Sequence, residues 1–274
     1  MSATTARKAP STWSLGLHRG LLEMKAFFRE RDAVVFTFAL PAVLLALLGS
    51  LFSGVYEGST VTPAQYLAPS MIAAGIASTT FVNLGIGIAA DREDGTLKRL
   101  RGAPVPPSAY FLGKVFMVLV ISLAEVALLL VIGVLMFGIE LPSDPQRWLT
   151  FTWVFLLGVT GCSLLGIAAS SLAGSARSAG AVMNLPYLVL AFVSGIFYTP
   201  ISALPEPLLQ AGSLFPLKWM AQGFRSVFLP DTILSHEVIH SWEHGRAALI
   251  LSVWCVGGLL LCLTTFRWRG RRDG

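Results

Sequence analysis

The feature that most constrains this chain is a set of six long apolar stretches that together contain a single charged residue. A bilayer has a hydrocarbon core about 30 Å thick, and a helix needs roughly 20 apolar residues to cross it. Six stretches are long enough, and Glu125 is the one charged residue inside them. They cover residues 33–53, 66–90, 115–139, 148–176, 178–205 and 247–266. Only 13% of the residues are charged, against about 25% in an ordinary soluble domain. The sequence therefore predicts an all-α membrane protein with six transmembrane helices.

Basic residues are distributed unevenly between the two sides that six spans define. One side holds both termini and the loop of residues 91–114, and it carries most of the lysines and arginines. The opposite side has Arg147, Lys218, Arg225 and Arg246. Because cytoplasmic loops carry an excess of basic residues, we expect the termini and this loop in the cytoplasm. Orientation and lipid headgroups account for the net charge of +5, so we expect membrane lipid and no nucleic acid as a partner.

The segment before the first span has the pattern of an amphipathic helix. Leu17, Leu21, Met24 and Phe28 recur at helical spacing, with charged residues around the rest of the helix. We therefore interpret residues 1–32 as a cytoplasmic tail and an interfacial helix that leads into the membrane.

The outer segment of residues 200–230 is too apolar for a solvated loop, yet prolines divide it into runs shorter than a span. Irregular backbone cannot face lipid, so we predict two re-entrant half-helices held by protein contacts. The transmembrane domain then covers residues 33–266, and a basic cytoplasmic tail follows at residues 267–274.

Polar residues inside the spans are candidates for a translocation path. These are Thr79, Asn83, Glu125 and Asn184. Thr79 and Asn83 belong to a stripe of small or polar residues at four-residue spacing, a pattern that also serves close helix packing alone. An amide in hydrocarbon must find a partner or face a cavity. Glu125 lies about 16 Å of helix beyond Lys114, near mid-membrane. We expect it to be a gate, a substrate contact or a proton site, or else a structural hydrogen bond to a neighbouring helix.

A short charged element separates the second and third spans. Its sequence, AADREDGTLKRLRGAPVPP, begins with acidic residues, continues through Gly95 and Thr96, and ends in prolines that stop a helix. Basic residues late in LKRLRG match the helix dipole. Leu97 and Leu100 would have nothing to pack on in water. They therefore lie either against the membrane-proximal helices or in a groove on a partner.

This loop resembles one in the permease subunits of type-2 ABC exporters, a family that includes daunorubicin-resistance and polysaccharide-export permeases. In that family an acidic segment, then Gly-Thr-Leu, a Leu and a Pro join the second and third spans. The matching residues are Asp91, Glu93, Gly95, Thr96, Leu97, Leu100 and Pro104. The outer segment is similar too, with Gly195, Pro205, Pro216 and Arg225 in recurring places. Lys98 departs from the pattern, since the family commonly has an acidic residue there.

The resemblance implies the fold of a type-2 ABC permease, with a cytoplasmic coupling helix seated on a separate ATPase. We expect the coupling loop, residues 91–110 with Arg101, to contact that ATPase. The chain has no G-x-x-x-x-G-K-[ST] loop, so we expect no cofactor on it and ATP with Mg²⁺ on the partner. Two permeases, as a homodimer, and two ATPases would form the transporter. We expect export of a hydrophobic drug, antibiotic or lipid across a bacterial cell membrane, with no enzyme activity of this chain's own.

A rival motif lies in the outer segment. HEVIH, residues 236–240, matches the H-E-x-x-H pattern, in which two histidines one helical turn apart hold zinc and the glutamate activates water. His236, His240 and His244 would be the metal-binding candidates of a membrane zinc protease. The competing interpretation is an interfacial helix anchored by Trp242. A third alternative, an ATP-independent transporter, predicts inverted repeats, which the sequence does not show.

Overall fold

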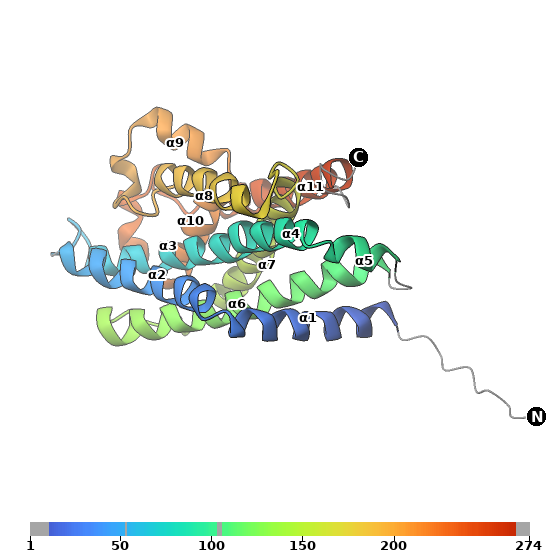
Figure 1. The fold of residues 1–274 in the computed structure, drawn as a ribbon. Helices are drawn as coiled ribbons and strands as arrows, with labels where there is room; N and C mark the ends of the chain where they lie inside the picture. Colours follow the sequence, from blue (N-terminus) through green and yellow to red (C-terminus); the bar gives the residue numbers. More distant parts are fainter. Residues whose placement is uncertain (1–10, 53, 103–105, 267–274) are drawn as a thin grey trace, which may run out of the picture.

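The computed structural model describes residues 11–52, 54–102 and 106–266, and the described residues are helical with no strand. Figure 1 shows the helices packed as one bundle. The helices of the first half are α1 (Thr12–Arg29), α2 (Arg31–Leu51), α3 (Pro63–Ala77), the π-helix η1 (Ser78–Asn83), α4 (Leu84–Glu93), α5 (Thr96–Gly102) and α6 (Pro107–Phe137). Those of the second half are α7 (Pro145–Ala169), α8 (Ala176–Val193), η2 (Ile201–Ala203), α9 (Glu206–Ser213), α10 (Pro216–Phe228), η3 (Asp231–His236) and α11 (His244–Thr265).

Six of these helices are long and apolar enough to cross a membrane. They are α2, the continuous α3–η1–α4 span, α6, α7, α8 and α11. The prediction of an all-α protein with six spans is confirmed.

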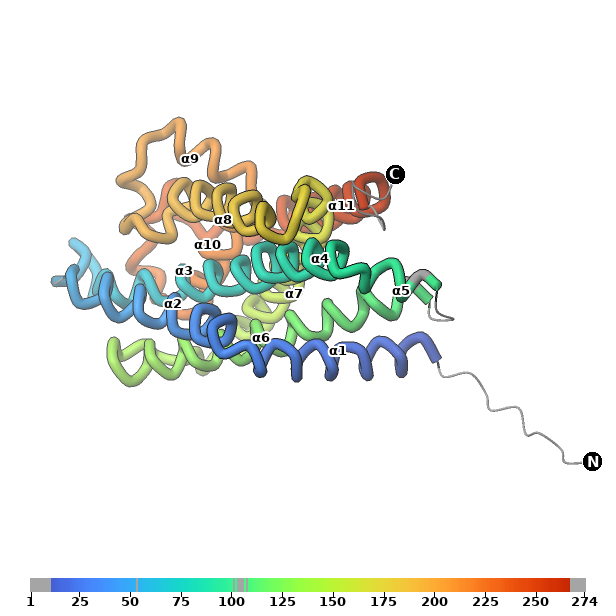
Figure 2. The backbone as a smooth tube through the Cα atoms, viewed as in Figure 1, coloured from blue at the N-terminus to red at the C-terminus, as the bar shows by residue number. Residues whose placement is uncertain are grey.

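The α3–η1–α4 span is the centre of the bundle. Figure 2 shows its backbone running between the other helices, and α3 packs against α2, α6, α7 and α10. Every α3 residue after Pro63 except Gln65 is buried. Because α3 is rich in alanine and glycine, the neighbouring helices can approach its backbone closely.

Helix α1 lies alongside the first half of α6 (Figure 1). Contact is made through glycines on both helices. A Cβ at Gly20 would lie 2.6 Å from Phe116, and one at Gly113 would lie 3.0 Å from the Gly20 nitrogen. The predicted apolar stripe faces the other way, with Leu17, Leu21 and Phe28 exposed. Lipid can cover this stripe, as an interfacial helix requires.

The fifth span is shorter than the sequence suggested. Helix α8 ends at Val193, and the expected continuation to residue 205 is wrong. Gly195 adopts φ +69, and a Cβ there would lie 2.6 Å from Ile201. The chain turns at this glycine, and the residues that follow lead into the hairpin of residues 200–230.

Two short helices form the outer hairpin, as predicted. Pro205 precedes α9, and Pro216 is the first residue of α10, where its fixed φ and missing N–H fit a helix start. All residues of α10 are buried, whereas α9 lies at the edge of the bundle (Figure 1). The Arg147 guanidinium donates to the carbonyl oxygens of Val227 (3.3 Å) and Leu229 (2.9 Å), which satisfies the end of α10.

Candidate functional site

The described part of the coupling loop (residues 91–110), called the coupling segment from here on, folds back onto the bundle. Helix α4 ends at Glu93, Gly95 adopts φ +73, and α5 begins at Thr96. Leu97 is fully buried against Leu84 and Ile88, while Leu100 is half-buried beside them. Of the two placements that the sequence left open for these leucines, packing against membrane-proximal helices is the observed one.

A buried lysine joins three helices at this end of the protein. The Lys114 Nζ of α6 lies 2.8 Å from Asp91 Oδ2 of α4 and 2.7 Å from Glu23 Oε2 of α1. The hydroxyl of Tyr110 donates to the same Asp91 oxygen at 2.7 Å. Lys114 is 4% exposed, so these charge-assisted bonds are shielded from water. The Asp91 carboxylate is bonded within the chain, and its contact with a partner stays a prediction.

The acidic turn, residues 91–95 between α4 and α5, also makes hydrogen bonds to the connection between α7 and α8. Glu93 Oε2 accepts a hydrogen bond from the backbone N–H of Ala176 at 2.5 Å, at the start of α8. The Arg92 guanidinium donates to the carbonyl oxygen (2.8 Å) and to the hydroxyl (3.2 Å) of Ser170. A carboxylate at a helix N-terminus is favoured by the helix dipole. The turn is therefore bonded to the end of α7 and to the start of α8.

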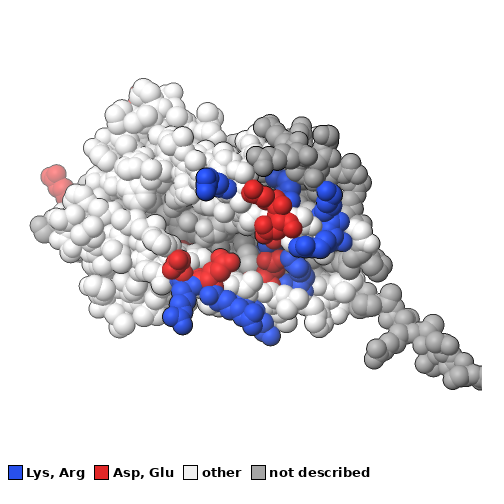
Figure 3. Space-filling model, viewed as in Figure 1, with Lys and Arg blue, Asp and Glu red and all other residues white. Residues whose placement is uncertain are grey.

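The outward face of the segment is charged. Glu93, Asp94, Lys98 and Arg99 are exposed, and a hollow of about 530 Å³ lies between α5 and α1. In Figure 3 the acidic and basic side chains gather over α1, α4 and α5, while the rest of this face is largely uncharged. The predicted contacts of Pro104 and of the Arg101 side chain lie outside the described part of the chain.

Two of the four predicted path residues meet in the middle of the bundle. Thr79 donates to Glu125 Oε2 at 3.0 Å, and Glu125 is 1% exposed. The other carboxyl oxygen, Oε1, has no hydrogen-bond partner and lies against the bare backbone of Gly75, where a Cβ would be 2.3 Å away. Thr79 lies in the π-helix η1, a form that often marks functional sites.

The two asparagines lie elsewhere. Asn83 donates to the Thr37 hydroxyl of α2 at 3.0 Å. Asn184 is exposed on α8 and donates to the Gly180 carbonyl oxygen at 2.9 Å. The structure therefore does not bring the four predicted residues into one site.

A buried ion pair that was not predicted from the sequence joins α10 to the residue that follows η3. Arg225 of α10 bonds Glu237 through two nitrogens, at 2.6 and 3.1 Å, and both side chains are fully buried. Ser70 accepts from Arg225 at 3.1 Å, and Tyr66 donates to Glu237 at 3.0 Å. Burial disfavours the charged guanidinium, but Glu237 together with Tyr66 and Tyr56 outweighs this effect and raises the pKa of Arg225. The pair ties α10 and the outer segment to the start of α3.

The zinc-site interpretation of HEVIH is wrong. The 3₁₀ helix η3 ends at His236, and His240 adopts φ +53, so the two histidines do not share a helical face. His236 bonds the Glu57 carbonyl oxygen, and His240 bonds that of Leu234. Glu237 is fully buried and bonded to Arg225. No group of three or more potential metal ligands exists among the residues that the structure describes.

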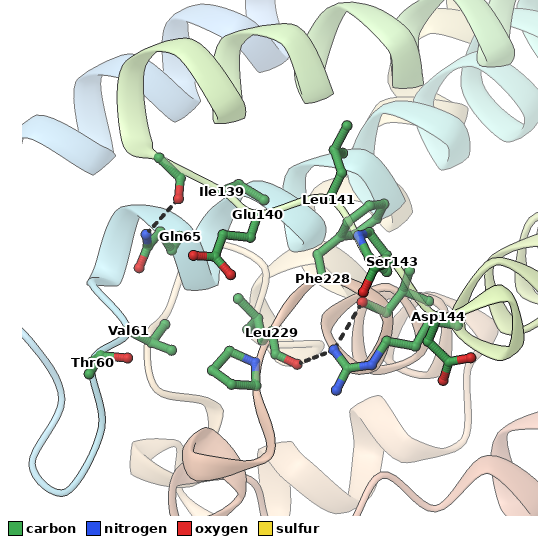
Figure 4. Close-up of a pocket in the computed structure, with 15 residues that line it drawn as sticks. Thr60, Val61, Gln65, Ile139, Glu140, Leu141, Ser143, Asp144, Phe228 and Leu229 are labelled. Atoms are coloured by element: carbon green, nitrogen blue, oxygen red, sulfur yellow. Dashed lines mark hydrogen bonds between the residues drawn. The ribbon is translucent and has the colours of Figure 1, made fainter.

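A hollow of about 640 Å³ opens near the outer end of α6 (Figure 4). Its Gln65 amide donates to the carbonyl oxygens of Phe137 (3.0 Å) and Gly138 (3.2 Å), and Arg147 holds the end of α10 from the other side. These polar groups therefore fasten the connection between α6 and α7 to its neighbours.

Comparison with protein families gives a match to the ABC-2 type transporter domain over residues 21–229. The chain belongs to the ABC-2 type transporter family. A comparison with curated proteins finds no match. As a transporter of this family, the protein is a multi-pass membrane permease, and the family implies pairing with an ABC ATPase subunit.

The ABC-2 domain covers the coupling segment and both outer helices. Glu237 and Glu243 lie after it. Sequence reasoning assigned Glu237 to zinc chemistry and missed Glu243. Glu243 lies 3.7 Å from the buried Lys218 Nζ and 3.1 Å from Arg246. A signal was present in the sequence, because Lys218 and Arg225 lie in an apolar, proline-flanked run where a charge needs a partner.

Proposed function

We propose that this permease exports a hydrophobic drug, antibiotic or lipid, driven by a separate ATPase subunit. ATP and Mg²⁺ are bound by the ATPase, and two permeases with two ATPases form the transporter. The observation that carries the proposal is the coupling segment. It joins α1, α6 and α8 through its own side chains, and the face that it turns away from the bundle is charged.

In this proposal the ATPase pushes on α5 and the acidic turn. ATP binding closes the ATPase pair, and the displacement reaches α6 and α1 through the buried Lys114, and α8 through Glu93. The buried Lys114 ion pairs have narrow geometric tolerance, so α1 and α6 move with the turn, and α8 follows through its hydrogen bond to Glu93. The spans then rearrange between an inward-open and an outward-open state.

The exposed Asn184 supports a homodimer. Helix α8 is an 18-residue span with little burial, and Asn184 is on its exposed side. A polar side chain at membrane depth faces a protein neighbour or a water-filled cavity in preference to lipid. A second copy of the permease packed against α8 would provide the protein neighbour that Asn184 requires. Separately, the spans contain few charged residues, which suits an apolar cargo.

The charge distribution supports a cell-membrane location with cytoplasmic termini. The end of the bundle that carries α5 also carries Arg19, Lys98, Arg99, Lys114 and Arg177. An excess of basic residues on one side is typical of the cytoplasmic side. The excess of arginine over lysine in the sequence fits a bacterial source.

Charge reversal on α5 tests this function. The buried Leu97 is unsuitable, because Leu97→Asp would disrupt packing within the permease itself. Lys98→Glu and Arg99→Glu change exposed side chains, and Lys25→Glu on α1 is a matched exposed control.

We expect the α5 variants to lower ATPase co-purification and transport-coupled ATP hydrolysis at least about five-fold, while Lys25→Glu and the thermal stability of all three stay near wild type. Equal ATPase binding by the α5 variants and the control would refute the assignment. Transport by the permease without any ATPase would refute ATP-driven export.

A further inference from the structure

A carboxyl group is buried in the middle of the bundle with little to hold it. Glu125 of α6 is 1% exposed, and its Oε2 accepts a hydrogen bond from Thr79 of η1 at 3.0 Å. Its other oxygen, Oε1, is buried and has no hydrogen-bond partner. The carboxyl lies against the bare backbone of Gly75, which leaves no room for a side chain there. Within the part of the chain that the structure describes, one hydrogen bond therefore holds this carboxyl.

The helices packed around Glu125 keep their charged residues away from it. Helix α3 and η1 contain none, and α2, α7 and α8 carry theirs in their first turns. Helix α1 packs on the first half of α6, where its Glu23 bonds Lys114. The titratable neighbour of the carboxyl is Tyr187 of α8, whose hydroxyl donates to the Ala74 carbonyl oxygen at 3.1 Å. Glu125 thus faces no cation among the described residues.

These surroundings favour a neutral carboxyl group. A carboxylate buried without a cation loses far more solvation energy than a neutral acid does, so burial stabilises the protonated form. A purely structural role would be filled equally well by glutamine, whose amide oxygen can accept from Thr79. Ionisable residues inside a membrane-spanning bundle are rare and mark functional sites, proton sites among them. The observed contacts do not use the property that distinguishes glutamate from glutamine, which is its ability to ionise.

The carboxyl lies where three spans meet, and two of them are bonded to the acidic turn. Helix α6 is bonded to the turn through Lys114, and α8 through the backbone N–H of Ala176. The third is the central span, which contributes Thr79 from its π-helical turn. Such turns are frequent at functional sites. A displacement of the acidic turn would therefore move α6 and α8 against η1, and this motion would separate Thr79 from Glu125.

We infer that Glu125 is a protonation switch of the transport cycle, neutral in the conformation described here and ionised once α6, α8 and η1 separate and admit water. On opening, the carboxylic acid transfers its proton to water and becomes a hydrated carboxylate, and on closing it takes a proton back. Because opening releases a proton, a higher pH favours the open state and a lower pH the closed one. The inference rests on the ATP-driven cycle proposed above and adds to it a step that responds to pH.

Infrared spectroscopy tests the inference, because the carbonyl stretch of a neutral carboxylic acid is separate from the bands of a carboxylate. The permease alone and its complex with the ATPase are measured in lipid, and the complex is measured again after ATP and orthovanadate have arrested its cycle. Glu125→Gln cannot ionise and keeps an acceptor for Thr79. Glu140→Gln, at an exposed acid between α6 and α7, is the matched control.

We expect a neutral-acid band in wild type and Glu140→Gln, no such band in Glu125→Gln, and loss of the wild-type band in the arrested complex. At unchanged thermal stability, Glu125→Gln should lower coupled ATP hydrolysis at least about five-fold and flatten its pH profile, because this variant cannot release a proton.

A structural hydrogen bond alone predicts equal ATP hydrolysis and equal pH profiles in the two variants, and that result would overturn the inference. A wild-type permease without the band, or a band that the arrest leaves unchanged, would also overturn it, and these two measurements do not depend on how a variant folds. The permease measured alone separates the two proposals. A band there with no ATPase bound to the permease would refute the ATP-driven function and still support a neutral Glu125.

Discussion

Replacing Glu237 by glutamine separates the ion-pair role of this residue from the role that its HEVIH motif suggested. Glutamine keeps the shape of the side chain and can still accept from Tyr66, which donates to Glu237 Oε1 at 3.0 Å. It removes the charge that the fully buried Arg225 guanidinium faces at 2.6 and 3.1 Å. In a zinc protease the same change would abolish catalysis and leave the fold intact.

The magnitude follows from burial. Removing one partner of a buried ion pair costs about 3–5 kcal/mol, because the other charge stays buried without compensation. The lower end applies, since glutamine retains hydrogen bonds and Ser70 still accepts from Arg225 at 3.1 Å. For a chain of this size about 3 kcal/mol corresponds to a fall in the unfolding temperature of about 6–12 °C.

Labelling of cysteines during heating measures this change. Cys162 is buried, so a thiol-reactive dye reaches it only when the bundle opens. Glu140→Gln, at an exposed acid between α6 and α7, is the matched control. Replacing Arg225 by methionine and Glu237 by leucine together should recover most of the lost stability, because no buried charge then remains. An unchanged unfolding temperature in Glu237→Gln, or a double variant no more stable than the single one, would refute the reasoning.

Three further substitutions test the inner end and the centre of the bundle. Lys114→Met leaves the Asp91 and Glu23 carboxylates without their shared cation, so thermal unfolding should show a loss of about 1–3 kcal/mol in stability. We also expect weaker coupling of ATP hydrolysis to transport. Methionine fills a similar volume, so the loss reflects the missing charge. Gly75→Ala places a methyl group 2.3 Å from the Glu125 carboxyl; thermal unfolding should show a loss of about 1–3 kcal/mol that Glu125→Ala relieves, and a stable single variant would contradict the contact. Gly95→Ala meets no neighbour within 4 Å, so its expected cost of about 1–2 kcal/mol is backbone strain at φ +73; Gly95→Asn should keep coupled ATP hydrolysis better, and equal activity of the two would count against strain.

The spans could be predicted from sequence because their signal is local. Charge-free runs of sufficient length identify a helix wherever it lies in the bundle. The end of the fifth span was missed because residues 194–205 carry no charge, so the charge-free run continues beyond the last residue of α8. The helix ends because Gly195 adopts φ +69 and lies close to Ile201. A glycine within an apolar run does not indicate whether the helix continues.

The direction in which the side chains of the coupling segment point could not be predicted, because it depends on contacts with residues distant in sequence. Leu97 of α5 packs on Leu84 and Ile88 of the preceding helix α4, and Asp91 forms an ion pair with Lys114 of α6. Glu237 was assigned to metal chemistry because its motif is short and local. Its partner Arg225 lies on another element, and nothing in the spacing of the two residues indicates a pair.

The outer ion pair, the inner lysine and the π-helix act on the same span. The Arg225–Glu237 pair holds the beginning of α3 through Tyr66 and Ser70, and Lys114 holds the end of α4 through Asp91. Between these attachments the one departure from α-helical geometry is η1, where Thr79 bonds Glu125. A span fixed at both ends transmits a push along its length unless one of its turns yields, and π-helical turns are rare and occur mostly as single-turn bulges inside α-helices. A displacement at α5 would therefore reach the outer hairpin as a rigid motion or be absorbed at η1, and the Thr79–Glu125 bond is the contact that changes in the second case.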